Sequence, residues 1–215
     1  MQRNTFLSHI PPVTKNILII NLILWLASTI LLRTGISLDY ILGLHYVESG
    51  TFKFYQPITY LFMHGSFSHI FFNMFAVFMF GRVLEETWGS KQFLIYYLIT
   101  GIGAAVIQEC VWFFTLPPLY YDFALTIGAS GAVFGILLAF GMMFPNIPLY
   151  LMFIPIPIKA KYFVTGYGLI ELFLGIASFS GDNVAHFAHL GGMLFGYFLI
   201  IYWKKKAKSH GNYFQ

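Results

Sequence analysis

Six long apolar segments run through this chain of 215 residues, and they constrain its fold more than any other feature. Only 9% of the residues are charged, whereas a soluble domain carries roughly 25%. Too few charged side chains remain to cover the surface of a water-soluble body of this size. A membrane-spanning helix needs about 20 apolar residues, and the candidate segments are 15–32, 58–80, 93–113, 127–144, 162–179 and 184–203. The sequence therefore predicts an all-α membrane protein, a bundle of six transmembrane helices.

The basic residues predict the orientation of this bundle. With six spans both termini lie on one side, and that side collects ten lysines and arginines, against two on the other side. Because cytoplasmic loops are enriched in lysine and arginine, we expect a multi-pass protein of a bacterial cytoplasmic membrane with both termini in the cytoplasm. The lysines at 204–208 are most simply a stop signal beside an anionic leaflet, so the expected partner is the lipid bilayer and not a nucleic acid. The ten are Arg3, Lys15, Arg82, Lys91, Lys159, Lys161, Lys204, Lys205, Lys206 and Lys208, and the two are Arg33 and Lys53.

The segments leave no room for a second domain. We expect a single membrane domain over residues 1–215, with short tails at about 1–14 and 204–215 and a long outer loop, roughly 35–57, between the first two spans. The first segment has no small-residue cleavage site after it, so we expect it to remain in the mature protein. The single cysteine, Cys110, excludes an intramolecular disulfide framework.

Polar side chains inside apolar segments are costly and mark candidate functional sites. If the spans alternate in direction, Ser130 and His189 lie at similar depths, just inside the outer ends of the fourth and sixth spans. Small residues recur at i, i+4 beside both of them, and such stripes let two helices approach closely in a membrane. We therefore expect Ser130 and His189 to meet. The polar residues are His64, His69, Asn73, Ser130, Glu171, His186 and His189, and the stripes are Gly131, Gly135 and Ala139, then Gly192 and Gly196, with Gly191 beside the second stripe.

A serine next to a histidine indicates nucleophilic catalysis, because the imidazole can accept the proton of the hydroxyl group. Apart from Lys15 at the start of the first span, no lysine or aspartate lies inside a span, which leaves a Ser/His dyad whose ring is oriented by packing or by a neutral neighbour. A tetrahedral intermediate also needs hydrogen-bond donors for its oxyanion. His69 and Asn73 share one helix face at i, i+4 spacing, and with the backbone N–H of Ser130 they are candidate donors. Taken singly, His69 or Asn73 is more often a hydrogen-bonding link between helices.

Three motifs together resemble the signatures of rhomboid intramembrane serine proteases. They are His64-x4-His69-x3-Asn73, Gly128-Ala129-Ser130-Gly131 and His189-x2-Gly192-x3-Gly196, and the spacing Gly81-x3-Glu85-x3-Gly89 is similar as well. The resemblance implies a six-helix rhomboid-like fold with Ser130 as nucleophile, His189 as general base and acid, and His69 and Asn73 as oxyanion donors. It also implies a supporting role for His64 near the first loop. Such enzymes cleave membrane-anchored protein substrates near the outer end of their transmembrane helix. The first loop departs from the family in one place, where Phe52-Lys53 stands for the usual Trp-Arg pair.

Other functions remain open at this point. Four histidines could bind a metal, but there is no H-E-x-x-H motif and no carboxylate at ligand spacing, so we expect no metal and no cofactor. An aspartyl protease is excluded, because Asp39, Asp122 and Asp182 fall in outer loops. A catalytically inactive rhomboid-like protein that binds or transports is the main alternative. We expect Glu171 to be a neutral or hydrogen-bonded helix contact and His186 to have at most a supporting role; the sequence does not indicate the oligomeric state or the natural substrate.

Overall fold

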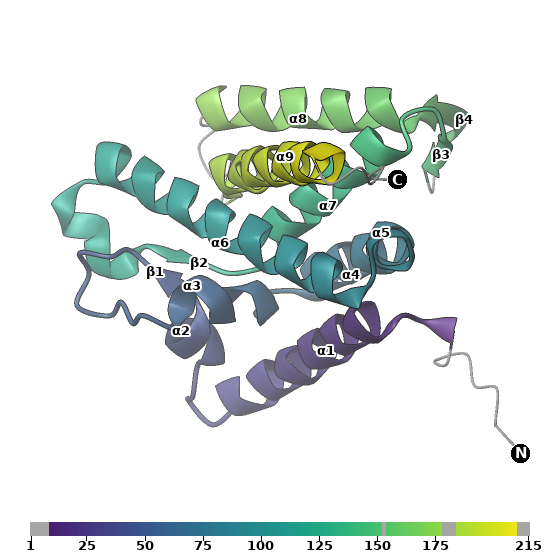
Figure 1. The fold of residues 1–215 in the computed structure, drawn as a ribbon. Coiled ribbons are helices and arrows are strands. Elements are labelled where there is room, and N and C mark those ends of the chain that lie inside the picture. Colours follow the sequence, from purple (N-terminus) through teal and green to yellow (C-terminus); the bar gives the residue numbers. More distant parts are fainter. Residues whose placement is uncertain (1–8, 152–153, 178–183, 210–215) are drawn as a thin grey trace, which may run out of the picture.

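The computed structural model describes residues 9–151, 154–177 and 184–209, and helices dominate this part of the chain (Figure 1). A π-helical segment, Val77–Gly81, joins α4 to α5, so that one helical stretch runs from Phe67 to Trp88. Short helices and 3-10 turns fill the connections: α2 (Leu38–Leu42), α3 (Gln56–Thr59), Tyr60–Phe62 and Pro118–Phe123. The main helices are α1 (Pro12–Leu32), α4 (Phe67–Ala76), α5 (Arg82–Trp88), α6 (Ser90–Thr115), α7 (Ser130–Met143), α8 (Ala160–Ala177) and α9 (His186–Ser209).

Among the residues that the structure describes, four helical stretches are long and apolar enough to cross a bilayer: Pro12–Leu32, Phe67–Trp88, Ser90–Thr115 and Ala160–Ala177. They correspond to the first, second, third and fifth predicted spans. The fourth is represented by α7, which has 14 residues and is therefore about 21 Å long at 1.5 Å per residue. That is shorter than a hydrocarbon core of about 30 Å. The sixth is represented by α9, which has 24 residues but ends in a lysine-rich turn.

The second span begins later than the sequence predicts. Residues 58–62 belong to α3 and the following 3-10 turn, and α4 begins at Phe67. Ser66 caps α4, because its hydroxyl oxygen accepts a hydrogen bond of 3.1 Å from the backbone N–H of His69. The break contains His64, Gly65 and Ser66 between apolar residues on both sides, and the predicted span ran across these three residues. His64 consequently lies in the connection before the helix and not within it.

The purely α-helical prediction missed four short strands. Strand β1 (Leu44–His45) pairs antiparallel with β2 (Leu125–Thr126), and β3 (Pro148–Leu151) pairs with β4 (Ile154–Lys159). Strands β1 and β2 have two residues each, too few for a readable periodicity, and the prolines in β3 and β4 argue against strands. The β1–β2 pair joins the connection between α1 and α4 to the segment that leads into α7.

Helix α7 lies in the interior of the bundle, where α6 and α9 pack against it (Figure 1). Ten of its residues are buried. A Cβ atom at Gly192 of α9 would collide with the backbone carbonyl of Gly131 in α7, so the two backbones are in direct contact there. The predicted close approach of these two helices through glycine is confirmed at this pair.

The other glycines of the two stripes pack against α6. Gly135 lies against Thr100, where an added Cβ would come within 2.7 Å of the threonine side chain. Gly196 lies against Tyr96, and Gly191, which we expected beside the contact, lies against Ile107. Helix α6 thus packs against glycines that we expected at the contact between α7 and α9. It can do so because both of these helices pack against α6.

Glu85 explains the glycine and glutamate spacing that follows the second span. Its buried carboxylate accepts hydrogen bonds from the backbone N–H groups of Val13 and Thr14 at 2.9 and 2.7 Å. The hydroxyl groups of Thr14 and Ser90 donate to it as well, each at 2.7 Å. A carboxylate at a helix N-terminus satisfies backbone donors that have no partner within the helix. Glu85 therefore anchors the start of α1 to the junction of α5 and α6.

Candidate active site

Ser130 and His189 meet at the ends of two packed helices. Ser130 is the first residue of α7, and His189 lies in the first turn of α9. The Oγ atom of Ser130 is 2.8 Å from Nε2 of His189, which is hydrogen-bond distance. The contact between Gly131 and Gly192 brings the two helix ends together, since each glycine is within three residues of one partner.

The ring of His189 stacks on Phe134. The two ring centroids are 4.3 Å apart and the planes differ by 9°. Phe134 lies one turn after Ser130 on α7, so the serine and the aromatic ring face His189 from the same helix. The stack restricts the ring plane of His189. Phe134 was not among the residues predicted for the site, although its i, i+4 spacing from Ser130 was a usable signal.

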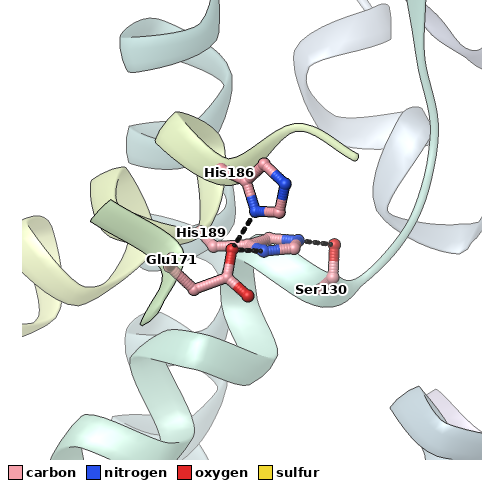
Figure 2. A network of polar contacts seen from close by, with 4 residues as sticks. All are labelled: Ser130, Glu171, His186 and His189. Carbon is pink, nitrogen blue, oxygen red and sulfur yellow. Dashed lines mark hydrogen bonds and ion pairs between the residues drawn. The ribbon is translucent and has the colours of Figure 1, made fainter. Parts of the chain in front are cut away.

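Glu171 and His186 extend this pair into a chain of four polar side chains, which Figure 2 shows together. Oε2 of Glu171 is 2.8 Å from Nδ1 of His189 and 2.7 Å from Nδ1 of His186. The three side chains are buried, with between 6 and 9% of their surface exposed.

The contact corrects one expectation and bears out another. We expected packing or a neutral neighbour to orient the ring of His189, but an ionisable carboxyl group from α8 contacts it directly. Glu171 is also, as expected, a hydrogen-bonded contact between helices. A sign that Glu171 makes such a contact was present in the sequence, because Glu171 is the sole acidic residue in the fifth predicted span.

The predicted oxyanion donors are His69 and Asn73, which belong to α4. They line the same cavity as Ser130. A Cβ atom at Gly128 would lie 2.6 Å from Nε2 of His69 and 3.7 Å from Oγ of Ser130, so both side chains lie close to Gly128. Gly128 has a positive φ of 126°, a conformation that L side chains rarely adopt. The Nδ2 atom of Asn73 donates a hydrogen bond of 3.0 Å to the backbone carbonyl of His69.

A cavity of about 1550 Å³ opens beside these residues. Ser130, His189, His69 and Asn73 all line it, and most of the remaining lining is apolar or aromatic, with residues from α4, the π-helical segment, α7 and the segment before α7 among them. A cavity of this size and character has room for an extended apolar peptide segment. The four residues are part of its polar lining.

His64 lies next to His69. The two ring centroids are 4.9 Å apart, in an edge-to-face arrangement. His64 is 2% exposed, and within the described part of the chain neither ring nitrogen has a hydrogen-bond partner. Its ring is in contact with that of His69.

One group of side chains in the described residues has the composition of a metal site. One ligand atom each from Glu171, His186 and His189 lies within 4.8 Å of the other two. In a tetrahedral zinc site with bonds of about 2.0–2.1 Å, neighbouring ligand atoms are roughly 3.3 Å apart. The carboxylate oxygen is 2.7 and 2.8 Å from the two nitrogens. These separations are those of hydrogen bonds.

Comparison with known proteins gives the family. Residues 51–206 match the Rhomboid domain. Rhomboid-like protease 3 of Toxoplasma gondii is 27% identical over 81% of this chain and 62% of its own length. The putative rhomboid protease YdcA of Bacillus subtilis is 29% identical over 87% of this chain and 86% of its own length. Rhomboid-like protein 11, chloroplastic, of Arabidopsis thaliana is 30% identical over 68% of this chain and 51% of its own length. The chain thus spans less than two thirds of the Toxoplasma and Arabidopsis relatives. It is an integral membrane protein, and it belongs to the rhomboid family.

Proposed function

We propose that this protein is an intramembrane serine endopeptidase that cleaves membrane-anchored proteins near the outer end of their transmembrane helix. The observation that carries the proposal is the 2.8 Å contact between Ser130 Oγ and His189 Nε2. Both residues line a cavity whose walls are mainly apolar side chains. Because α7 is shorter than the bilayer is thick, its first residue lies below the membrane surface when the helix is centred in the bundle.

Ser130 and His189 divide the chemistry between them. Nε2 of His189 accepts the proton of the Ser130 hydroxyl group as Oγ attacks the carbonyl carbon of the scissile bond. The protonated imidazole then transfers this proton to the leaving amine nitrogen. The acyl group remains on Oγ until a water molecule, deprotonated by His189 in the same way, releases it.

The oxyanion of the tetrahedral intermediate needs donors on the same side of the cavity. The backbone N–H of Ser130 is at the start of a helix, where backbone N–H groups lack acceptors within the helix. His69 and Asn73 add side-chain donors. In the structure Asn73 donates to the carbonyl of its own helix, so we infer that substrate binding redirects this amide toward the oxyanion, while His64 supports the ring of His69.

The proposed setting is a bacterial cytoplasmic membrane, with residues 1–215 as one domain of six membrane helices in which α7 and α9 are the fourth and sixth. The start of α1, helix α5, the β3–β4 hairpin and the C-terminal end all lie toward one side of the bundle (Figure 1). Basic residues gather at these elements, among them Arg82, Lys159 and Lys161. The positive-inside bias then places both termini in the cytoplasm and Ser130 toward the outer face. The partners are transmembrane protein substrates and the lipid bilayer, with no nucleic acid.

The test is cleavage in proteoliposomes. The purified protein is reconstituted with a single-span substrate that has small residues at the outer end of its helix, and mass spectrometry maps the fragments. We expect one cut in that outer region. Binding of the substrate without any cut would favour the alternative, a catalytically inactive rhomboid-like protein that binds or transports.

Removal of one oxyanion donor should slow catalysis without loss of substrate binding. We expect His69→Ala and Asn73→Ala each to lower kcat, by up to about 10² to 10³-fold, and Asn73→Ala to have the smaller effect because two donors remain. Initial rates over a substrate titration separate kcat from KM. Full turnover in both variants, with unchanged KM, would mean that these residues have a structural role.

Activity should survive the removal of divalent metals. Prolonged treatment with EDTA and with 1,10-phenanthroline, followed by gel filtration in detergent, is expected to leave the rate unchanged. The physical reason is that the carboxylate of Glu171 and the two imidazoles are at hydrogen-bond separation. Loss of activity that zinc restores would instead make this group of residues a metal site.

A further inference from the structure

We propose that Glu171 is a third member of the catalytic unit, a positioning residue that orients His189 and balances its charge, with His186 fixing the carboxylate in turn. This inference rests on the proposed function and names how its base is controlled. Glu171 comes from α8, whereas the two histidines come from α9. The carboxylate therefore reaches across a helix contact to the far side of the ring that faces Ser130.

Glu171 determines the tautomer of His189 through its contact with Nδ1. A neutral imidazole carries one N–H, and the other nitrogen is an acceptor. A carboxylate oxygen 2.8 Å from Nδ1 favours the proton on Nδ1, because the carboxylate can only accept. Nε2 is then the acceptor nitrogen, and it is 2.8 Å from Oγ of Ser130. Glu171 thus selects the tautomer that can act as a base toward the serine.

Glu171 also balances the positive charge that His189 acquires during catalysis. When His189 takes the serine proton it carries protons on both nitrogens and becomes positive, while an oxyanion forms on the substrate. The ring is 9% exposed and Glu171 is 6% exposed, so water screens the new charge poorly. A carboxylate in direct contact with the ring stabilises this imidazolium, as acidic residues do in other serine hydrolases. It takes up no proton itself.

His186 takes no part in the proton transfer, but it contacts the same carboxylate. Its Nδ1 atom donates to the same oxygen of Glu171 at 2.7 Å. His186 and His189 are three residues apart on α9. With both rings donating an N–H to one oxygen, the carboxylate is held in a single position between them. The edge-to-face contact of the two imidazoles, with centroids 6.3 Å apart, keeps this arrangement compact. His186 therefore positions Glu171, and Glu171 positions His189.

A contact between α8 and α9 that only braces the bundle would have the same distances, so the test must separate the two roles. Glu171→Gln keeps the size and an acceptor oxygen but removes the charge and adds a donor. Glu171→Asp keeps the charge on a shorter side chain. Wild type, both variants and Gly166→Ala, a change on α8 with nothing within 4 Å of the new Cβ, are compared for kcat, KM and Tm in one detergent.

We expect Glu171→Gln to lower kcat by about 10²-fold or more, as loss of the orienting carboxylate does in other serine hydrolases, with KM within about twofold of wild type and Tm little changed. Glu171→Asp should recover part of the lost kcat, and Gly166→Ala should match wild type. An unchanged kcat in Glu171→Gln, a rate in Glu171→Asp no higher than in Glu171→Gln, or a loss of kcat explained by a fall in Tm would each overturn the inference. Failure of the wild type to cleave would instead count against the proposed function, so the two failures are distinguishable.

Discussion

Ser130→Ala and His189→Ala should each reduce cleavage of a transmembrane substrate to background, a loss of at least about 10⁴-fold in kcat. Ser130→Ala removes the attacking oxygen, and His189→Ala removes the group that takes its proton. The two act as one unit, so the double variant should be no slower than either single variant. The measurement is the initial rate in proteoliposomes with equal amounts of folded protein.

Folding is the necessary control for this comparison. Ser130→Ala deletes one oxygen at the start of α7, and we expect its Tm to stay close to that of wild type. His189→Ala also loses the stack on Phe134 and the contact with Glu171, so some loss of stability is expected there. Ser130→Ala is therefore the cleaner variant. Substantial turnover by folded Ser130→Ala would rule out the serine mechanism.

Gly192→Val should lose both activity and thermal stability. Any Cβ atom at Gly192 would collide with the backbone carbonyl of Gly131, and a backbone atom cannot move aside as the tip of a side chain can. Overpacking of this kind costs about 1–3 kcal/mol, and occasionally more. The helices must separate, and about 1 Å of misplacement can cost near 10²-fold in rate. Ser130 and His189 stand beside this contact, so the rate falls together with Tm.

The matched control is Gly166→Val on α8, where nothing lies within 4 Å of the added Cβ. It should keep full activity and nearly the Tm of wild type. Gly191 is not suitable as a mild control, because a Cβ atom there would come within 2.7 Å of Ile107. Rate and Tm of the variants at Gly192 and Gly166 are measured in the same detergent. Equal tolerance at the two positions would mean that the contact with Gly131 does not set the distance between Ser130 and His189.

The sequence predicted the parts of the fold that depend on long-range patterns. Hydrophobic length located the main helices, and the spacing of glycines beside Ser130 and His189 predicted that two helices approach closely there. Both patterns extend over several helical turns, so a single irregular residue does not hide them. The start of α4 was misplaced because apolar residues lie on both sides of the break at residues 63–66, although Gly65 and the cap Ser66 were a local signal for it.

The contacts between elements were harder to predict. Nothing in the spacing of Glu171 shows that α8 turns it toward α9, because that depends on how each helix is rotated about its axis. The β1–β2 pair has the same difficulty, since Leu44 and Thr126 are far apart in the chain and each strand has two residues. Phe134 is an intermediate case, because its distance from Ser130 was readable but its stacking partner was not.

The most direct test of the serine mechanism is the site of covalent modification by a fluorophosphonate probe. Such a probe reacts with a serine that a neighbouring base has activated. The reconstituted protein is labelled, digested and analysed by mass spectrometry, alongside His189→Ala. We expect one phosphonate adduct, on Ser130, that is absent from His189→Ala. An adduct on another serine, or no adduct on a protein that cleaves its substrate, would contradict the serine mechanism.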